Sequence, residues 1–136
     1  MIRALRLTNS FRLLLISLLF FIITGCGFSG PAPQQSTTIG NPTASDILAS
    51  DPSANIIVYQ DIVYQTGIQW VDELELTKGE LVLEILKYSR VGDEFANGTA
   101  SGLPVGTKIY GVKERGDIVI AETDQGDIRF YALVEG

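Results

Sequence analysis

The densest groups of reactive side chains in this sequence are carboxylates. They lie in two places: Asp72, Glu73 and Glu75, and further on Asp93 and Glu94. A pair of carboxylates can hydrolyse a glycoside, but only in a substrate cleft, for which so small a domain leaves little room. The chain has no histidine, which removes the usual general base, the usual zinc ligand and the hydrolytic triad. We therefore expect no catalytic residue, no metal and no cofactor.

Aromatic side chains are the second group that could form contacts. They are Tyr59, Tyr64, Trp70, Tyr88, Phe95, Tyr110, Phe130 and Tyr131. Most should pack in the core, although exposed rings could stack on sugars or peptides. Phe130 and Tyr131 are neighbours on an expected strand, so they point to opposite faces and one of them should be exposed. Trp70, Phe130 and Tyr131 are the candidate partner contacts.

The single cysteine, Cys26, follows a segment with its own pattern. Arg3, Arg6 and Arg12 precede and border an apolar run that ends at Ile23, the n-region and h-region of a signal peptide. The tetrapeptide Ile23-Thr24-Gly25-Cys26 resembles the lipobox of bacterial lipoprotein precursors. This resemblance implies a diacylglyceryl group on the thiol of Cys26 and cleavage between Gly25 and Cys26. The alternative is that residues 7–28 remain as an uncleaved anchor.

The expected mature chain is strongly acidic. Removing residues 1–25 takes away three of the ten basic residues and none of the sixteen acidic ones, so the formal charge becomes 7 − 16 = −9. This charge repels nucleic acid phosphates, so we expect no nucleic acid partner. The expected partners are the membrane, through the lipid on Cys26, and a protein of the cell envelope. The expected location is the extracytoplasmic face of the cell membrane.

Composition divides the chain into three parts. We expect a lipoprotein signal peptide over 1–25, a lipid-anchored flexible linker over 26–54 and a small β-rich domain over 55–136. The linker is rich in Gly, Pro, Ser and Thr and has no Lys or Arg. Within it, residues 43–49 could form one or two helical turns with a Ser or Thr cap.

The pattern of residues 55–136 predicts a mainly β (α+β) domain, a small curled antiparallel sheet or barrel of about six strands with one short helix. The expected strands are Ile56–Tyr59, Ile62–Tyr64, Glu80–Tyr88, Thr107–Lys113, Asp117–Thr123 and Asp127–Val134. Gln60-Asp61 predicts a tight hairpin, with one kinked strand as the competing interpretation. The helix is expected over 67–75, and Glu80–Tyr88 should be a central strand. Residues 90–106 should be a loop, mobile and prone to deamidation at Asn97-Gly98.

Several segments carry a resemblance to a family. They are Ile62-Val63-Tyr64, Trp70, Glu75–Glu80, Asn97–Ala100, Leu103–Tyr110 and Leu133–Gly136. They look like a set of small lipoproteins and secreted proteins of Gram-positive, spore-forming bacteria. The resemblance implies an extracytoplasmic location and, because that family has no established activity, nothing about mechanism.

Three functions remain open from the sequence. The leading hypothesis is a non-enzymatic, membrane-tethered module that binds a partner or serves a structural role in the cell envelope. The first alternative is a small acidic inhibitor or immunity lipoprotein that blocks a basic protein. The second alternative is an enzyme or small-ligand carrier that uses carboxylates in a concave pocket.

Overall fold

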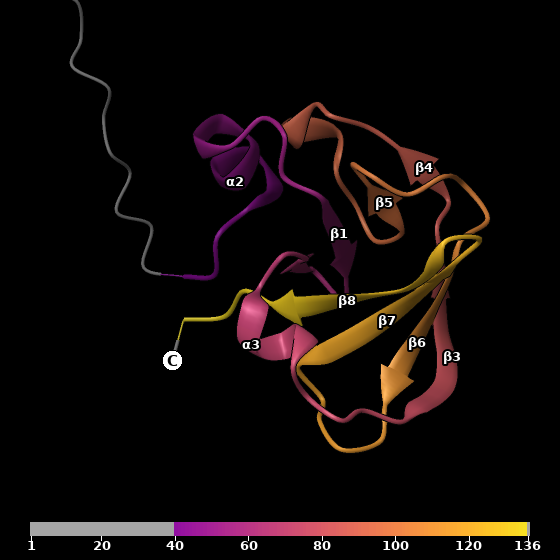
Figure 1. Cartoon of the computed structure of the whole chain (residues 1–136). Helices are drawn as coiled ribbons and strands as arrows, with labels where there is room; N and C mark the ends of the chain where they lie inside the picture. Colours follow the sequence, from indigo (N-terminus) through magenta and orange to yellow (C-terminus); the bar gives the residue numbers. More distant parts are fainter. Residues whose placement is uncertain (1–39, 136) are drawn as a thin grey trace, which may run out of the picture. The chain divides into compact units, whose positions relative to one another are not determined.

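The computed structural model describes residues 40–135, which form an eight-stranded sheet with two short helices (Figure 1). The strands are β1 (Ile56–Tyr59), β2 (Ile62–Gln65), β3 (Lys78–Glu84), β4 (Lys87–Tyr88), β5 (Thr99–Ala100), β6 (Lys108–Val112), β7 (Ile118–Thr123) and β8 (Gly126–Ala132). The helices are α2 (Ala44–Ser50) and α3 (Gln69–Asp72), with a 3-10 turn η1 (Gly92–Glu94). The predicted signal peptide, Gly25 and Cys26 lie outside the described residues. In residues 40–135 no helix has the length and apolar character needed to cross a bilayer.

The sheet is mixed and curled into a half-barrel. Its strand order is β3-β6-β7-β8-β2-β1-β5-β4, and every neighbouring pair is antiparallel except β4 and β5. The mainly β prediction is confirmed. The prediction of about six antiparallel strands is wrong in detail: β4 is a separate two-residue strand at the end of the expected strand Glu80–Tyr88, β5 lies inside the expected loop, and the two pair parallel. The helical turns predicted over residues 43–49 are confirmed as α2, which Thr43 caps.

The β1–β2 hairpin forms as the sequence predicts. Gln60 and Asp61 have φ angles of 50° and 60°, the left-handed values that a two-residue type I′ turn requires. Ile57 pairs with Tyr64, and Tyr59 pairs with Ile62. The competing interpretation of one kinked strand is therefore wrong.

The expected central strand Glu80–Tyr88 is instead divided between the two ends of the sheet. β3 is one edge and β4 is the other, and only Ile85 and Leu86 separate them along the chain. Ile85 is fully buried, and its amide donates to the Thr107 carbonyl at 2.9 Å. The amide of Leu86 donates to the Gly98 carbonyl at 2.8 Å. Because consecutive residues reach both edges, the sheet has to curl.

The three strands predicted at the C-terminal end are present as β6, β7 and β8 and form an antiparallel meander. β6 pairs with β7 and β7 pairs with β8, each antiparallel through a short turn. Along β7, Val119 and Ala121 belong to the main core cluster, so Ile118 and Ile120 face the opposite side. Ile118 and Ile120 are also buried, at 1% and 4% exposure. Both faces of the meander are therefore covered.

Two apolar clusters hold the fold together. The main one fills the concave side of the sheet, and it includes Ile57, Tyr64, Ile85, Leu103, Ile109, Val119 and Phe130. The second joins α2 to the other side of β1 and β2, and its members are Ala44, Leu48, Ala54, Ile56, Val58 and Val63. Because α2 is part of this cluster, the folded unit begins before residue 55. The predicted linker over 26–54 is too long at its C-terminal end.

The loop between β4 and β6 is held by its polar side chains. The Asn97 side chain accepts from the Asp61 amide at 2.9 Å, and the Gly98 amide donates to the Val58 carbonyl at 2.9 Å. Deamidation requires the Gly98 nitrogen to attack the Asn97 side chain, and both groups are engaged here. These hydrogen bonds restrain the loop at this position, and deamidation at Asn97-Gly98 stays a prediction.

Candidate binding surface

The connection from β2 to β3 crosses the outer face of the meander. β2 lies beside β8 and β3 lies beside β6, so residues 66–77 have to pass over three strands. We call residues 66–77 the strap; α3 is its helical part and lies against β8 (Figure 1). The expected helix over 67–75 is thus present but limited to Gln69–Asp72. Val71 is the buried apolar residue of α3, at 1% exposure.

Arg129 fastens the strap. It lies on the outer face of β8, opposite Ile120 of β7. Its Nη1 donates to the carbonyls of Val71 at 2.7 Å, Asp72 at 3.1 Å and Leu74 at 2.6 Å. The last carbonyls of a helix have no partner within it, and a guanidinium close by supplies one. One side chain therefore fixes where the short helix ends.

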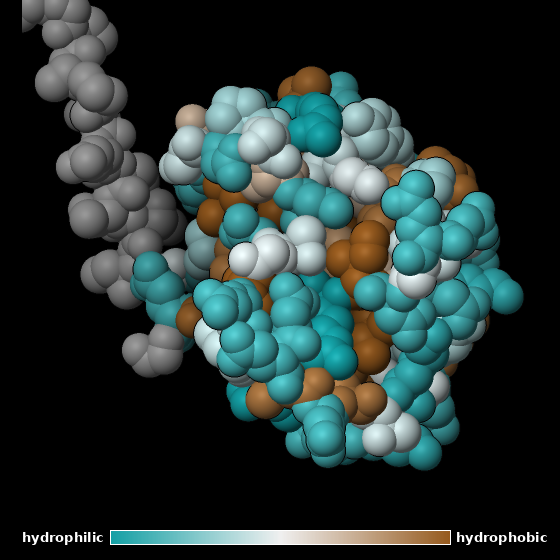
Figure 2. Space-filling model, in the orientation of Figure 1, coloured by the Kyte–Doolittle hydropathy of each residue, from teal (hydrophilic) through white to brown (hydrophobic). Residues whose placement is uncertain are grey.

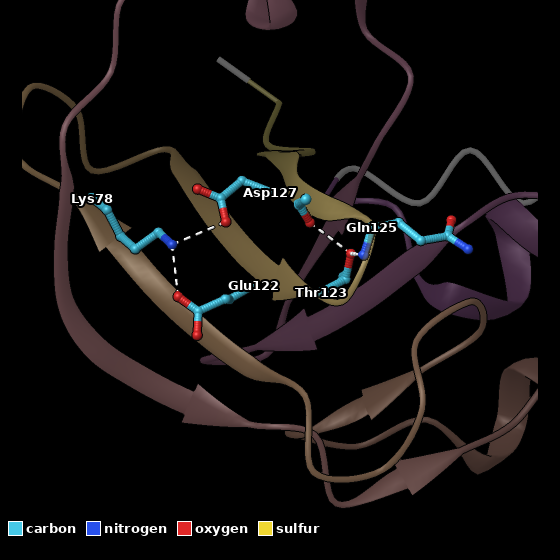
Figure 3. Close-up of polar contacts among 6 residues, drawn as sticks. Lys78, Glu122, Thr123, Gln125 and Asp127 are labelled. Carbon is cyan, nitrogen blue, oxygen red and sulfur yellow. Dashed lines mark hydrogen bonds and ion pairs between the residues drawn. The ribbon is translucent and has the colours of Figure 1, made fainter.

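Lys78 is the first residue of β3 and holds the end of the strap in place. Its Nζ lies 2.8 Å from Glu122 and 2.9 Å from Asp127 (Figure 3), and 5.1 Å from the centre of the Tyr110 ring. The hydrogen bonds to Glu122 and then to Asp127 raise the pKa of Lys78. In the adjoining turn the Thr123 hydroxyl donates to the Gly126 carbonyl at 2.6 Å. The two ion pairs of Lys78 tie the end of the strap to β7 and β8.

The outer side of α3 carries an exposed aromatic residue in a defined setting. The Trp70 side chain is 43% exposed, and its ring lies 5.0 Å from the Tyr131 ring in an edge-to-face arrangement at 76°. The Arg115 guanidinium lies 5.3 Å from the centre of the Trp70 ring. We call Trp70, Tyr131, Arg115 and Asp117 the Trp70 cluster.

Asp117 fixes Arg115 in that position. Arg115 Nε donates to Asp117 Oδ1 at 2.8 Å, and Nη2 donates to Oδ2 at 2.6 Å. Two parallel bonds between guanidinium and carboxylate set the orientation as well as the distance. The bond from Arg115 lowers the pKa of Asp117, and the same pairing raises the pKa of Arg115. The guanidinium is therefore held beside the ring rather than free in solvent.

Of the three candidate contacts predicted from the sequence, the structure brings two together. Trp70 and Tyr131 are in contact, whereas Phe130 has no exposed surface and belongs to the main core. Phe130 is therefore wrong as a surface contact, because its side of β8 faces the main core cluster. Arg115 is a further member of this surface that the sequence analysis does not include among the candidate contacts. A signal existed: the turn that contains Arg115 leads directly into Ile118, which pairs with Tyr131.

The two carboxylate groups lie on different elements. Asp93 and Glu94 are in η1, where they accept from the hydroxyls of Ser45 at 2.6 Å and Ser89 at 2.8 Å. The other three lie on the strap and are exposed: Asp72, Glu73 and Glu75. Within residues 40–135 no three His, Cys, Asp or Glu side chains gather in a way that could hold a metal ion.

An open depression of about 310 Å³ lies at the other end of the meander. It is lined by residues 104–108 together with Glu122, Thr123 and Asp124. Glu122 is paired with Lys78, so the depression does not present two free carboxylates to a substrate. The most specific arrangement of exposed side chains is therefore the Trp70 cluster.

No known protein family, curated protein or solved structure matches this chain. Inferences about function therefore rest on the surface of the protein. On the face seen in Figure 2, hydrophilic residues predominate and hydrophobic ones form small separate groups.

Proposed function

We propose that this protein is an extracytoplasmic lipoprotein, tethered to the cell membrane by lipid on Cys26, whose folded part is a non-enzymatic binding module of the cell envelope. The lipobox-like segment Ile23–Cys26 supports the anchor. The observation that carries the binding role is the Trp70 cluster. Exposed Trp, Tyr and Arg side chains are the types that dominate binding energy at protein interfaces.

The anchor is tested by intact mass and membrane partitioning of the natively expressed chain beside a Cys26→Ala variant. The proposal expects a diacylglyceryl mass on Cys26 and membrane association in the wild type. The Cys26→Ala variant should be released or left unprocessed. If both proteins keep residues 1–25 and stay in the membrane, residues 7–28 are a plain anchor and the lipoprotein proposal is wrong.

The binding role is tested by cross-linking in intact cells that express the full chain, followed by capture from envelope extract. A partner recovered with the wild type and with Tyr88→Ala, but not with Trp70→Ala, is the expected result. Tyr88 is a suitable control because it is exposed, at 53%, and lies on the edge strand β4, whereas Trp70 packs against Tyr131 of β8 in the middle of the strand order. Recovery that does not depend on Trp70 would place the contact elsewhere.

A small acidic inhibitor or immunity lipoprotein is the second candidate. It is favoured by the excess of sixteen carboxylates over seven basic residues from residue 26 onward. Such a charge steers a basic protein toward the surface over long range. Loss of the captured partner at 0.5 M salt would favour this function, because the screening length there falls to a few ångströms.

A further inference from the structure

We propose that the Trp70 cluster and the acidic strap beside it receive a cationic segment, rich in arginine or lysine, of a partner protein. This inference rests on the proposed binding function and names the chemistry of its ligand. The occupant follows from three features: an exposed aromatic ring on the strap, the Arg115 guanidinium already seated against that ring, and exposed carboxylates on the strap that form no ion pair.

The ring is the first feature. Trp70 leaves 43% of its surface to solvent although Tyr131 and Arg115 both lie against it. Tryptophan is the aromatic side chain that attracts cations most strongly. Arg115, the second feature, shows that a guanidinium fits here, at 5.3 Å from the ring centre. A second cation on the exposed part of the ring would meet the same electrostatic attraction.

The carboxylates of the strap are the third feature. Glu73 directly follows α3 with helical backbone angles and lies three residues after Trp70, so the two side chains lie on the same side. Asp72 and Glu75 flank it, and all three carboxylates are exposed. Glu73 accepts a hydrogen bond from Gln69 at 3.1 Å, and none of the three forms an ion pair within the described residues. Residues 66–77 contain these three acidic residues and no basic one, so the strap that carries Trp70 has a formal charge of −3.

None of the other cations of the described residues forms an ion pair with the strap. Lys78, Lys87 and Arg115 are paired with carboxylates of other elements, and Lys108 and Lys113 form no ion pair. Arg129 is directed at backbone carbonyls, underneath the strap. The cation nearest to the ring, Arg115, is neutralised by Asp117. A cationic partner would thus be attracted by the acidic strap without opposition from Arg115.

The site is also held in place before a ligand arrives. Arg129 fixes the end of α3, and Asp117 fixes Arg115. A surface that is already ordered loses less conformational entropy on binding. The cationic segment therefore meets an ordered ring and a defined row of charges.

The test uses the full chain in non-ionic detergent and two peptides: a six-arginine peptide and its citrulline counterpart, which has the same shape without charge. Trp70 is the only tryptophan, so its fluorescence reports on the site directly. Calorimetry gives the affinity of each variant. The arginine peptide should change the Trp70 emission and bind, whereas the citrulline peptide should bind at least about tenfold more weakly.

Two triple variants separate a specific site from general attraction. The site variant carries Asp72→Asn, Glu73→Gln and Glu75→Gln. The matched control carries Glu80→Gln, Glu84→Gln and Asp124→Asn, exposed positions on β3 and in the β7–β8 turn, with the same change of charge. The site variant and Trp70→Ala should each reduce the affinity for the arginine peptide about tenfold. The control should reduce it less than about threefold.

Two results would overturn the inference. Equal weakening by both triple variants would show attraction to net charge alone, and an unchanged Trp70 emission would place the peptide elsewhere. The proposed binding function has a separate outcome. A cellular partner that needs Trp70 but stays bound to the site triple variant at 0.5 M salt would leave that function standing while ending the cationic inference.

Discussion

The two helices that cover the outer face of the sheet, α2 and α3, are attached to it by different forces. α2 covers β1 and β2 with buried apolar side chains, among them Ala44 and Leu48. α3 covers the meander with one buried apolar residue, Val71, and relies on the hydrogen bonds of Arg129. The free energy gained by burying apolar surface is roughly proportional to the buried area and does not depend on direction, whereas hydrogen bonds fix an orientation. The second covering can therefore keep its largest side chain, Trp70, in solvent.

The two helices also differ in how closely they contact the rest of the protein. α2 meets η1 so tightly that a Cβ on Gly92 would lie 2.4 Å from the Ser45 Cα. Its start is closed by a capping box between Thr43 and Asp46. α3 has no side chain that caps its N-terminus. We conclude that α2 completes the fold, while α3 presents a surface.

The largest expected effect is on the apolar covering. Leu48→Ala should lower the free energy of unfolding by about 3 kcal/mol, because it removes a buried side chain that neighbours cannot fully replace. Urea unfolding followed by circular dichroism measures this. The exposed neighbour Ala49 provides the control, and Ala49→Ser should change stability by less than about 0.5 kcal/mol. Equal, small changes in both would mean that α2 does not stabilise the sheet.

The attachment of α3 to the sheet should depend most on Arg129. Arg129→Met should cost about 2 kcal/mol, since it leaves the carbonyls of Val71, Asp72 and Leu74 without their donor. The emission of Trp70 should also change, because the end of α3 is released. Arg90→Met is the matched control: Arg90 is exposed and donates to one carbonyl, that of Pro52. An unchanged Trp70 spectrum in Arg129→Met would show that the strap is held by other contacts.

Lys78 should matter less than Arg129, although it makes two ion pairs. Its partners Glu122 and Asp127 are about half exposed, and exposed ion pairs are weakened by solvent and salt. Lys78→Met should therefore reduce stability by clearly less than Arg129→Met under the same urea titration. If Lys78→Met proved the more damaging change, the ion pairs rather than the carbonyl bonds would be the main attachment of the strap.

The sequence predicts the locally paired parts of this fold. Hairpins need few residues, and the turns at Gln60-Asp61 and Asp124–Gly126 join strands that are adjacent along the chain. Alternation then assigns Phe130 and Tyr131 to opposite faces, which the structure confirms. Alternation does not show which face is covered, because that depends on the path of residues 66–77 across the sheet. The inward turn of Phe130 could therefore not be predicted.

Pairings between distant segments were not predictable from pattern alone. β4 and β5 have two residues each, too few to show alternation, and they pair parallel across a loop. The apolar run Leu81–Leu86 suggests one buried strand, but the break at Ile85 depends on partners at Thr107 and Gly106. Likewise, the placement of Arg115 beside Trp70 results from the strap crossing the sheet. Contacts of this kind are set by tertiary structure.

Acidification should produce the smallest effect and act on both coverings. The bond from the Thr43 hydroxyl lowers the pKa of Asp46, and the bond from Arg115 lowers the pKa of Asp117. A carboxylate with a lowered pKa stabilises the folded state above its unfolded value, about 3.9, and loses this contribution as the pH falls through the folded value.

Stability should therefore decline as the pH falls from about 5 toward 2, measured by urea unfolding at each pH. Asp46→Asn and Asp117→Asn should each make this decline shallower. The two variants should differ in Trp70 emission: Asp117→Asn frees Arg115 and alters it at neutral pH, whereas Asp46→Asn leaves it unchanged. A spectrum that responds equally to both would mean that the two coverings are coupled, and the contrast between a structural helix and a presenting helix would fail.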